Sequence, residues 1–299
     1  MFPKSLSTIP MSDEKPSISP PSSPEQTLDE IRDWADRMTL DLKTVDETIG
    51  ETTYHLSTLR DLDATIDLLF EELSKKNRPE LLNALCPYFG VIWPSARALA
   101  RVVDHGLVAG LQKTQDTRVL ELGCGLALPA LVAAKKGAQV HATDFHPQVD
   151  RFLKQNRAAN QALNVRYTSW DWRALFEQSS KSDTPSGSYR EKIPEPLAAN
   201  WGQFDWAIAS DVLYEEDLAI PLASAMAGAI KPKGRITITD PGRPYLQRFC
   251  DVLTKNEGFQ MATEVLRVSH PKKEDPRHEV EIFVLHFSKQ GQFPISSAR

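Results

Sequence analysis

The sequence predicts an α/β fold in which a mostly parallel sheet carries helices on both of its faces. Between residues 118 and 240, short apolar runs typical of buried strands alternate with segments whose apolar residues recur at helical spacing. This alternation is typical of strand–helix–strand units, whose successive strands lie parallel. Two apolar runs near the end, 259–268 and 279–287, follow each other with no helix between them, which indicates a closing antiparallel hairpin.

The individual elements follow from their flanking residues as well as from their spacing. One helix starts at Pro94, where the missing N–H of proline costs nothing, and another ends at Gly137. We expect strands at 118–122, 138–144, 164–169, 204–210 and 234–240. We expect the further helices at 128–137, 147–161, 216–230 and 243–258. These elements place the main domain at residues 85–290.

Residues 27–84 form an extension before this domain. A helix is expected over 27–47, because five apolar side chains can share one of its faces. They are Leu28, Ile31, Trp34, Met38 and Leu42. A short strand is expected at 52–60, followed by a capped helix that begins near Asp61 or Asp63.

Four segments are expected to lie outside the packed core. Residues 1–26 are rich in serine and proline and cannot bury enough apolar surface to offset the entropy of ordering, which predicts a disordered tail. The apolar-poor stretch 176–202 predicts a surface insertion, and 269–277 predicts a charged hairpin tip. Residues 291–299 are interpreted as a second tail.

Composition argues against several classes of protein. A net charge of −5 does not suit a general nucleic-acid binder, which needs a basic face for phosphates. The three cysteines, Cys86, Cys124 and Cys250, form neither a disulfide framework nor a zinc spacing, so no metal is expected. No apolar run approaches the roughly 20 residues of a membrane span, and the N-terminus lacks the apolar core of a signal peptide. We therefore expect a monomeric cytoplasmic protein that does not bind a membrane.

A glycine-rich turn, VLELGCGLALPALVAAKKGAQVHATD, carries the strongest functional signal. It joins the strand that ends in Glu121 and Leu122 to the following helix. Gly123 and Gly125 let the backbone turn tightly and approach a ligand with no Cβ in the way. Asp144 ends the next strand, and a carboxylate there can accept hydrogen bonds from both hydroxyls of a ribose. The pattern favours a ligand that contains adenosine.

Two adenosine ligands fit such a turn. A dinucleotide fingerprint needs a third glycine, but Leu128 stands at that position and Pro129 removes an N–H donor. A nicotinamide-dependent dehydrogenase is therefore the weaker alternative. Glu121, two residues before Gly123, suits a ligand with a cationic amino-acid end, namely S-adenosylmethionine. The structural alternative is a turn that connects a strand to a helix and binds no ligand.

At this point the sequence resembles a known family. The glycine-rich turn is similar to motif I of the class I, seven-strand S-adenosylmethionine-dependent methyltransferases. Further stretches, YFGVIWPSARALA, DW at 171–172, SDVLYEEDLAIPL and DPGRP, resemble the family 16 branch, which consists chiefly of protein lysine methyltransferases. The DPGRP stretch is most similar to enzymes that methylate the electron-transfer flavoprotein β subunit and to their bacterial relatives. The resemblance covers roughly residues 85–287 and implies a Rossmann-like, doubly wound sheet of seven strands.

The chain departs from the family pattern in three places. Ala127 stands where many relatives carry a third glycine. The first 50 residues and the 176–202 insertion have no counterpart that the resemblance covers.

The resemblance also implies which residues hold the cofactor. Trp93 is expected against the methionine–adenosine end, and Asp171 near the adenine amino group with Trp172 beside it. The full expected set is Trp93, Glu121, Gly123, Cys124, Gly125, Asp144, Phe145, Asp171, Trp172 and Ser210. Three of these residues have a structural alternative. Trp93 could be a core side chain, Asp171 could cap its turn, and Cys124 could be a small side chain that fills space in the turn. His146, next to Phe145, is interpreted as a surface histidine.

Four residues are expected on the catalytic side. Asp211 and Tyr214 resemble the D-x-x-Y motif that follows the fourth strand in this family, next to the transferred methyl group. Asp240 and Arg243 follow the fifth strand, and Arg243 can pair with either aspartate. The structural alternative makes Asp240 a helix cap.

These residues favour a protein lysine N-methyltransferase whose partner is a lysine side chain of another protein. A methyltransferase acting on the nitrogen or oxygen of a small molecule is the alternative, because fold and cofactor do not fix the acceptor. A non-catalytic module that keeps the fold is a third class, and the intact set of Glu121, Asp144, Asp211 and Tyr214 argues against it.

Overall fold

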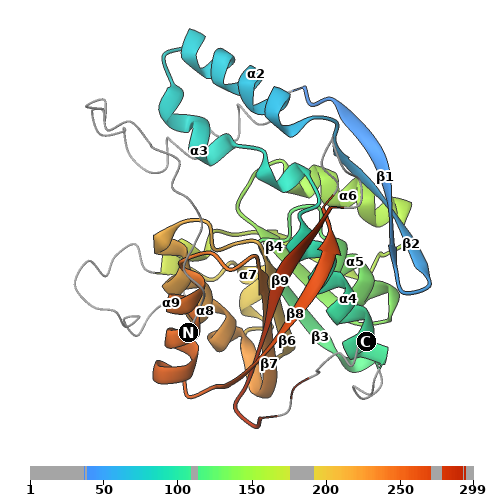
Figure 1. Cartoon of the computed structure of the whole chain (residues 1–299), viewed down its shortest axis with the longest axis vertical. Helices are drawn as coiled ribbons and strands as arrows, with labels where there is room; N and C mark the ends of the chain where they lie inside the picture. Colours follow the sequence, from blue (N-terminus) through green and yellow to red (C-terminus); the bar gives the residue numbers. More distant parts are fainter. Residues whose placement is uncertain are drawn as a thin grey trace.

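The structure is a computed structural model that describes residues 37, 39–108, 114–175, 192–270, 278–291 and 293. Its centre is a seven-stranded sheet with the strand order β5-β4-β3-β6-β7-β9-β8 (Figure 1). The parallel strands are β3 (Arg118–Leu122), β4 (Gln139–Asp144), β5 (Val165–Ser169), β6 (Phe204–Ser210) and β7 (Ile230–Asp240). Two antiparallel strands, β8 (Gln260–Ser269) and β9 (Glu279–Ser288), complete the sheet. The predicted fold class is confirmed.

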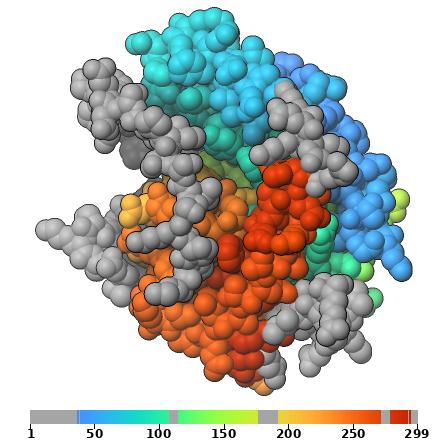
Figure 2. Space-filling view, viewed as in Figure 1, coloured from blue at the N-terminus to red at the C-terminus, as the bar shows by residue number. Residues whose placement is uncertain are grey.

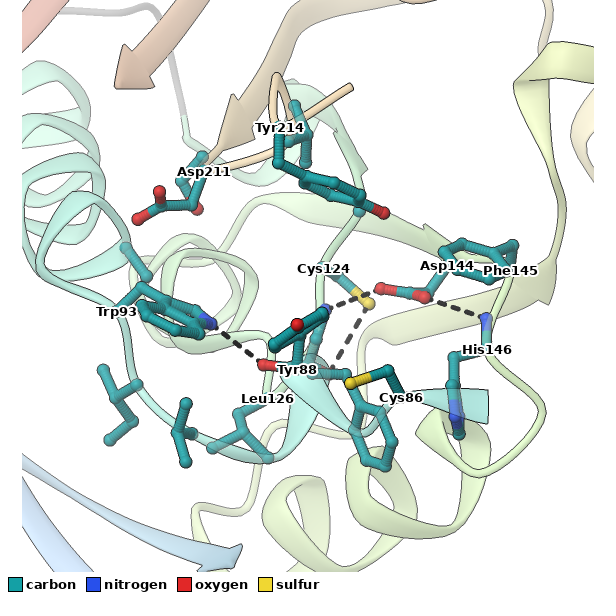
Figure 3. A pocket seen from close by; sticks show the side chains of 18 of the residues that line it. Cys86, Tyr88, Trp93, Cys124, Leu126, Asp144, Phe145, His146, Asp211 and Tyr214 are labelled. Atoms are coloured by element: carbon teal, nitrogen blue, oxygen red, sulfur yellow. Dashed lines mark hydrogen bonds between the residues drawn. The ribbon is translucent and has the colours of Figure 1, made fainter. Parts of the chain in front are cut away.

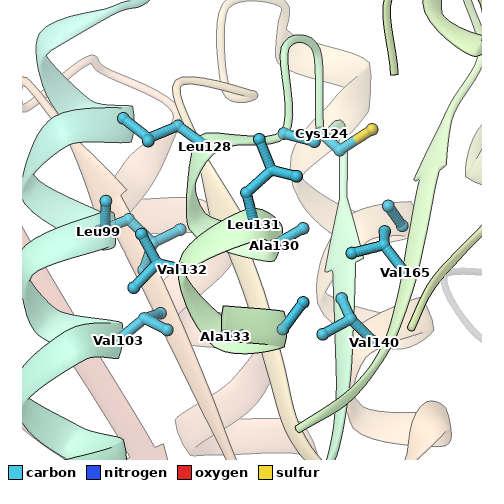
Figure 4. Packing of buried hydrophobic residues seen from close by; sticks show 14 of the residues in the cluster. Leu99, Val103, Cys124, Leu128, Ala130, Leu131, Val132, Ala133, Val140 and Val165 are labelled. Carbon is cyan, nitrogen blue, oxygen red and sulfur yellow. The ribbon is translucent and has the colours of Figure 1, made fainter. Parts of the chain in front are cut away.

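Helices cover both faces of the sheet because alternate strand residues point to opposite faces. On one face, Val119 of β3 packs with α4 (Pro94–Val108), α5 (Leu128–Lys135) and α6 (Val149–Ala159). Figure 4 shows Leu99 and Val103 of α4 against Val132 of α5. On the other face, Leu120 packs with α8 (Ala219–Ala229), α9 (Leu246–Asp251) and the π-helical turn Val252–Asn256. The chain thus forms three layers around two apolar cores.

A β-hairpin lies against α6 where the sequence predicted part of a helix. Strands β1 (Leu42–Ile49) and β2 (Thr52–Leu59) pair antiparallel through a turn at Gly50 with φ of 57°. The predicted helix is therefore wrong over 42–47, and most of 27–41 lies outside the described residues. The apolar spacing fitted a helix, but the β-branched residues on both sides of the Gly50 turn favour a hairpin. The predicted strand at β2 is confirmed.

The hairpin is fastened to the main domain by side chains of two helices. Asn160, which caps the end of α6, and Asn156 within α6 accept hydrogen bonds from the backbone N–H groups of His55 (2.9 Å) and Ser57 (2.8 Å), respectively. Arg97 of α4 forms a half-buried ion pair with Glu47 of β1 at 2.5 Å and donates to the carbonyl of Ile92 at 3.1 Å. These contacts make the hairpin part of the folded domain.

Residues 62–85 form a small helical unit that we call the α2–α3 segment. Asp61 caps α2 (Leu62–Lys75) by accepting the N–H of Ala64 at 3.1 Å, as the sequence predicted. The 3-10 turn Pro79–Leu81 and α3 (Leu82–Leu85) fold back on α2. Their buried leucines form a cluster separate from the cores of the sheet: Leu69, Leu73, Leu81 and Leu85. Figure 2 shows this segment, in cyan, projecting from one end of the molecule.

The end of the predicted surface insertion is buried. Ile193, Leu197 and Trp201 pack into the second core around the short α7 (Glu195–Ala198). Trp201 meets Trp170, which follows β5, edge to face at 5.6 Å between ring centroids. Their spacing of four residues is a helical signal, and for 192–202 the expectation of a surface loop is wrong. Residues 176–191 and most of the predicted hairpin tip at 269–277 lie outside the described residues.

Short 3-10 turns complete the described chain: Tyr88–Gly90, Thr114–Asp116, Trp172–Leu175 and Glu216–Leu218. Within the described ranges, none of the helices has both the length and the apolar character that crossing a membrane requires.

Candidate functional site

A pocket of about 480 Å³ opens at the carboxyl ends of the parallel strands (Figure 3). Its walls come from the β3–α5 turn, the ends of β4 and β6, the residues before α4, and the α2–α3 segment. The carboxyl ends of parallel strands meet at one edge of the sheet, where ligands of open α/β folds bind. The volume lies within the range that small ligands and cofactors occupy.

The glycine-rich turn forms the floor of this pocket in a left-handed conformation. Gly123 and Gly125 have φ values of 68° and 48°. A Cβ on Gly123 would lie 2.4 Å from Cγ1 of Val212, and one on Gly125 would lie 3.2 Å from the carbonyl oxygen of Phe89. Ala127 also has a positive φ, 60°, in the left-handed region that favours glycine. This chain holds an alanine in a strained conformation at the start of α5.

Asp144 connects this turn to the end of β4. Its Oδ2 accepts the N–H of Gly125 at 2.9 Å, and its Oδ1 accepts the N–H of His146 at 3.0 Å. Burial raises the pKa of the Asp144 carboxyl. A carboxylate has about four lone-pair sites, so Asp144 keeps acceptor capacity for ligand hydroxyls while it organises two loops.

Glu121 lies in the core below the turn rather than in the pocket wall. Its side chain is buried, and Oε2 accepts the N–H of Ala130 in α5 at 3.0 Å. Within the described chain, Oε1 has no hydrogen-bond partner. Burial raises the pKa of Glu121 to about 8. The carboxyl therefore anchors α5 from the core beneath the glycine-rich turn.

Glu121→Gln is expected to flatten the dependence of stability on pH. The raised pKa of Glu121 means that its stabilising effect is complete below about pH 4.5 and is lost as pH rises towards 8. A glutamine can still accept from Ala130 but does not titrate. Between pH 5 and 8.5, the wild type should lose about 3–5 kcal/mol of unfolding free energy relative to the variant. Urea unfolding at both pH values measures this, with exposed Glu195→Gln as control; parallel pH profiles would contradict it.

Two tryptophans of the predicted set line the pocket. Trp93 donates Nε1–H to the carbonyl of Tyr88 at 2.9 Å, which fixes its ring in the wall (Figure 3). Trp172 is buried and also lines the pocket. Asp171 is placed differently: its carboxylate accepts the N–H of Arg173 at 3.0 Å and pairs with its guanidinium at 2.7 Å. Asp171 caps its own turn and is absent from the pocket wall.

The predicted catalytic residues form a charged cluster at the ends of β6 and β7. Arg243 pairs with Asp211 at 2.5 Å and with Asp240 at 3.1 Å. Asp240 is fully buried and caps its loop by accepting the N–H groups of Gly242 and Arg243. Asp211 has φ of 60°, in the left-handed region that aspartate adopts more readily than most residues. Asp211, Arg243 and the half-exposed Tyr214 line the pocket, whereas Asp240 lies behind it.

The remaining predicted residues, Cys124, Phe145 and Ser210, also line the pocket. Burial raises the pKa of the Cys124 thiol well above its usual value, so the thiol stays protonated, in agreement with its interpretation as a filler. Of the fourteen predicted positions, the pocket wall lacks Glu121, Asp171 and Asp240.

His146 and several apolar residues of the wall were missed by the sequence analysis. The expectation of a surface histidine is wrong, because His146 is 2% exposed and lines the pocket. Its burial depends on α3 and on Phe89, both distant in sequence, so no local pattern reveals it. The other missed lining residues include Ile66, Leu82, Asn83, Cys86, Tyr88 and Phe89. Tyr88 and Phe89 belong to the apolar stretch that leads to Trp93, and this stretch is the sequence signal that could have placed them in the pocket wall.

Comparison with known proteins agrees with this geometry. Residues 88–185 match the model of the lysine methyltransferase family. The chain is 26% identical over 170 residues to the electron transfer flavoprotein beta subunit lysine methyltransferase of Xenopus laevis, covering 56% of this chain and 58% of that protein. It is 33% identical over 129 residues to the histone-arginine methyltransferase METTL23 of Xenopus laevis, covering 42% and 50%. The chain thus spans between half and three fifths of the length of these relatives.

A solved structure supports the fold. The SAM-dependent methyltransferase from Agrobacterium tumefaciens aligns with a TM-score of 0.52 at 10% identity, covering 85% of this chain and 72% of that one. The matched family segment runs from the 3-10 turn at Tyr88 through the glycine-rich turn and Asp144 to beyond Trp172, so it contains most of the pocket wall. Over residues 88–185 the chain is therefore similar to the lysine methyltransferase family.

Proposed function

We propose that the protein is an S-adenosylmethionine-dependent methyltransferase that acts on a lysine side chain of another protein. The observation that carries the proposal is the convergence, in one pocket, of Asp144 and the glycine-rich turn on one side and Asp211 and Tyr214 on the other. The first group suits an adenosine ligand, and the second suits a cationic acceptor. The family match supports the same assignment.

The residues present fit the cofactor. Asp144 has free acceptor capacity for ribose hydroxyls, and the turn at Gly123 and Gly125 has no Cβ to obstruct a ligand. Glu121 holds α5 beneath that turn by accepting the N–H of Ala130. Trp93 and Trp172 supply aromatic walls, which attract a sulfonium and a base respectively. When bound, the cofactor supplies a methyl group that is already activated on sulfur.

The acceptor side carries a charge that suits one cation. Two carboxylates facing one guanidinium, Asp211 and Asp240 around Arg243, leave one negative charge uncompensated. We assign Asp211 to binding and orienting the ammonium of lysine. It is a poor base for this step, because a nearby carboxylate raises the pKa of an amine above its free value of about 10.4. Tyr214 forms a ring wall that shields the reacting nitrogen from water.

An arginine acceptor is the second candidate. The relative with the higher identity is named for methylation of histone arginine, and a guanidinium carries the same single positive charge. A small-molecule acceptor remains the third candidate, and the partial exposure of Tyr214 favours a macromolecular one.

Calorimetric titration tests the cofactor. Micromolar binding of S-adenosylmethionine and S-adenosylhomocysteine is expected, and none of NAD, with Asp144→Ala losing most of the affinity. Absence of binding by both sulfur ligands would overturn the proposal. Incubation with tritiated cofactor and a cell lysate, followed by hydrolysis of the labelled protein, then separates methyllysine from methylarginine. Label confined to small molecules would exclude both protein acceptors.

A further inference from the structure

The α2–α3 segment contributes a wall of the pocket although it precedes the family match at residues 88–185. Ile66 of α2, together with Leu82 and Asn83 of α3, lines the pocket beside the glycine-rich turn and Asp144. Its leucines are buried among themselves rather than in the cores of the sheet. Because the α2–α3 segment has a small core of its own, contacts at its ends must hold it against the pocket.

His146 makes such a contact at the end of α3. Its Nε2 lies 3.2 Å from the carbonyl oxygen of Leu85, and its Nδ1 lies 3.3 Å from the backbone nitrogen of Gln148. Because the Gln148 N–H can only donate, Nδ1 accepts and the ring proton resides on Nε2, which donates to Leu85. Burial lowers the pKa of His146 to about 4, so the neutral ring persists at physiological pH.

The same residue is joined to the ligand-binding groups. Its backbone N–H donates to Oδ1 of Asp144 at 3.0 Å. Its ring packs on Phe89 with 4.3 Å between centroids, and the carbonyl of Phe89 lies against Gly125. His146 therefore touches, through backbone and side chain, the carboxylate that organises the pocket, the wall beside the glycine-rich turn, and the end of α3.

We propose that His146 is a positioning residue that fastens the α2–α3 segment over the cofactor pocket and thereby limits how fast the cofactor enters and leaves. The hydrogen bond from Nε2 to Leu85 is the fastening. The proposal rests on the proposed function, because the ligand whose exchange it governs is the methyl-donor cofactor. It adds that residues 62–85, outside the family match, belong functionally to the cofactor site.

Three variants isolate the hydrogen bond. His146→Phe keeps a ring against Phe89 and loses the donor. His146→Gln restores an N–H donor near the position of Nε2. His141→Phe is the matched control. His141 lies in β4, just before the bend that carries His146; it is buried, bonds Thr168 at 2.7 Å and is absent from the wall of the cofactor pocket.

Two measurements apply to each variant: the rate of S-adenosylhomocysteine release by stopped-flow fluorescence, and hydrogen–deuterium exchange of residues 62–85 without ligand. His146→Phe should release the ligand on the order of tenfold faster and exchange faster over 62–85, the size expected for one lost buried hydrogen bond. His146→Gln should recover most of both effects, and His141→Phe should change neither.

The outcomes separate this inference from the proposed function. If the wild type binds no S-adenosylhomocysteine, the proposed function fails, while the exchange of 62–85 still tests the fastening. If the wild type binds and His146→Phe releases the ligand at the wild-type rate, the inference is wrong. Equal acceleration in His141→Phe would also overturn it, because the effect would then come from lost stability.

Discussion

Asp211→Asn is expected to reduce methyl transfer by at least about a hundredfold while cofactor affinity stays within about twofold of the wild type. The substitution removes the negative charge to which we assign the orienting of the acceptor, and it leaves Arg243 paired with Asp240 alone. Asparagine is the right replacement because Asp211 has φ of 60°, a conformation that asparagine adopts readily and alanine does not. Turnover with a protein acceptor and calorimetry with S-adenosylhomocysteine measure the two quantities.

Glu216→Gln provides the control for Asp211→Asn. Glu216 lies in the same loop, but it is exposed, pairs with Arg248 and is absent from the pocket wall. This variant should retain both turnover and affinity. Unchanged turnover in Asp211→Asn would show that Asp211 does not orient the acceptor. A loss of cofactor affinity instead would show that Asp211 acts by shaping the pocket.

Gly123→Ala is expected to abolish cofactor binding and to lower the free energy of unfolding by about 3 kcal/mol. Two effects combine. An alanine at φ of 68° is strained, and its Cβ would lie 2.4 Å from Cγ1 of Val212. Relief of that overlap must move the glycine-rich turn or the start of the Asp211 loop, and both line the pocket. Urea unfolding and calorimetry measure the two losses.

Gly258→Ala separates the two effects. Gly258 has nearly the same φ, 70°, but a Cβ there would meet nothing within 4 Å. It should lose about 1 kcal/mol from backbone strain alone and keep full cofactor affinity. In the double variant Gly123→Ala, Val212→Ala, part of the lost stability should return. Equal losses at both glycines would show that contact with Val212 contributes nothing.

The sheet and its helices are predictable because their signals are local. β3, β4 and β6 are apolar runs of strand length, and α2 begins where Asp61 caps it. Strand β1 was misassigned because its apolar residues fit a helical spacing, and only pairing with β2 decides the conformation. Such pairing is a tertiary contact, which overrides local preference.

The site is predictable to the extent that strand ends define it. Asp144 and Asp211 follow parallel strands, and the topology brings them to one edge of the sheet. Asp171 and Asp240 also stand at strand ends, but their carboxylates bind groups of their own loops. Asp171 pairs with Arg173, and Asp240 pairs with Arg243. Which carboxylates face the pocket depends on the partners of their side chains. The burial of His146 depends on packing from α3. Neither feature can be recognised from a local pattern in the sequence.

The edge-to-face contact of Trp170 with Trp201 has a consequence for how such a chain can diversify. Trp170 follows β5 and Trp201 precedes β6, so their contact within the core holds together the two ends of the segment that joins these strands. Once the ends of a loop are fixed, each doubling of its length costs only about 0.6 kcal/mol of closure entropy. Insertions between Leu175 and Ile193 are therefore expected to cost little stability, whereas changes at Trp172 or Leu197 would reach the pocket wall or the core.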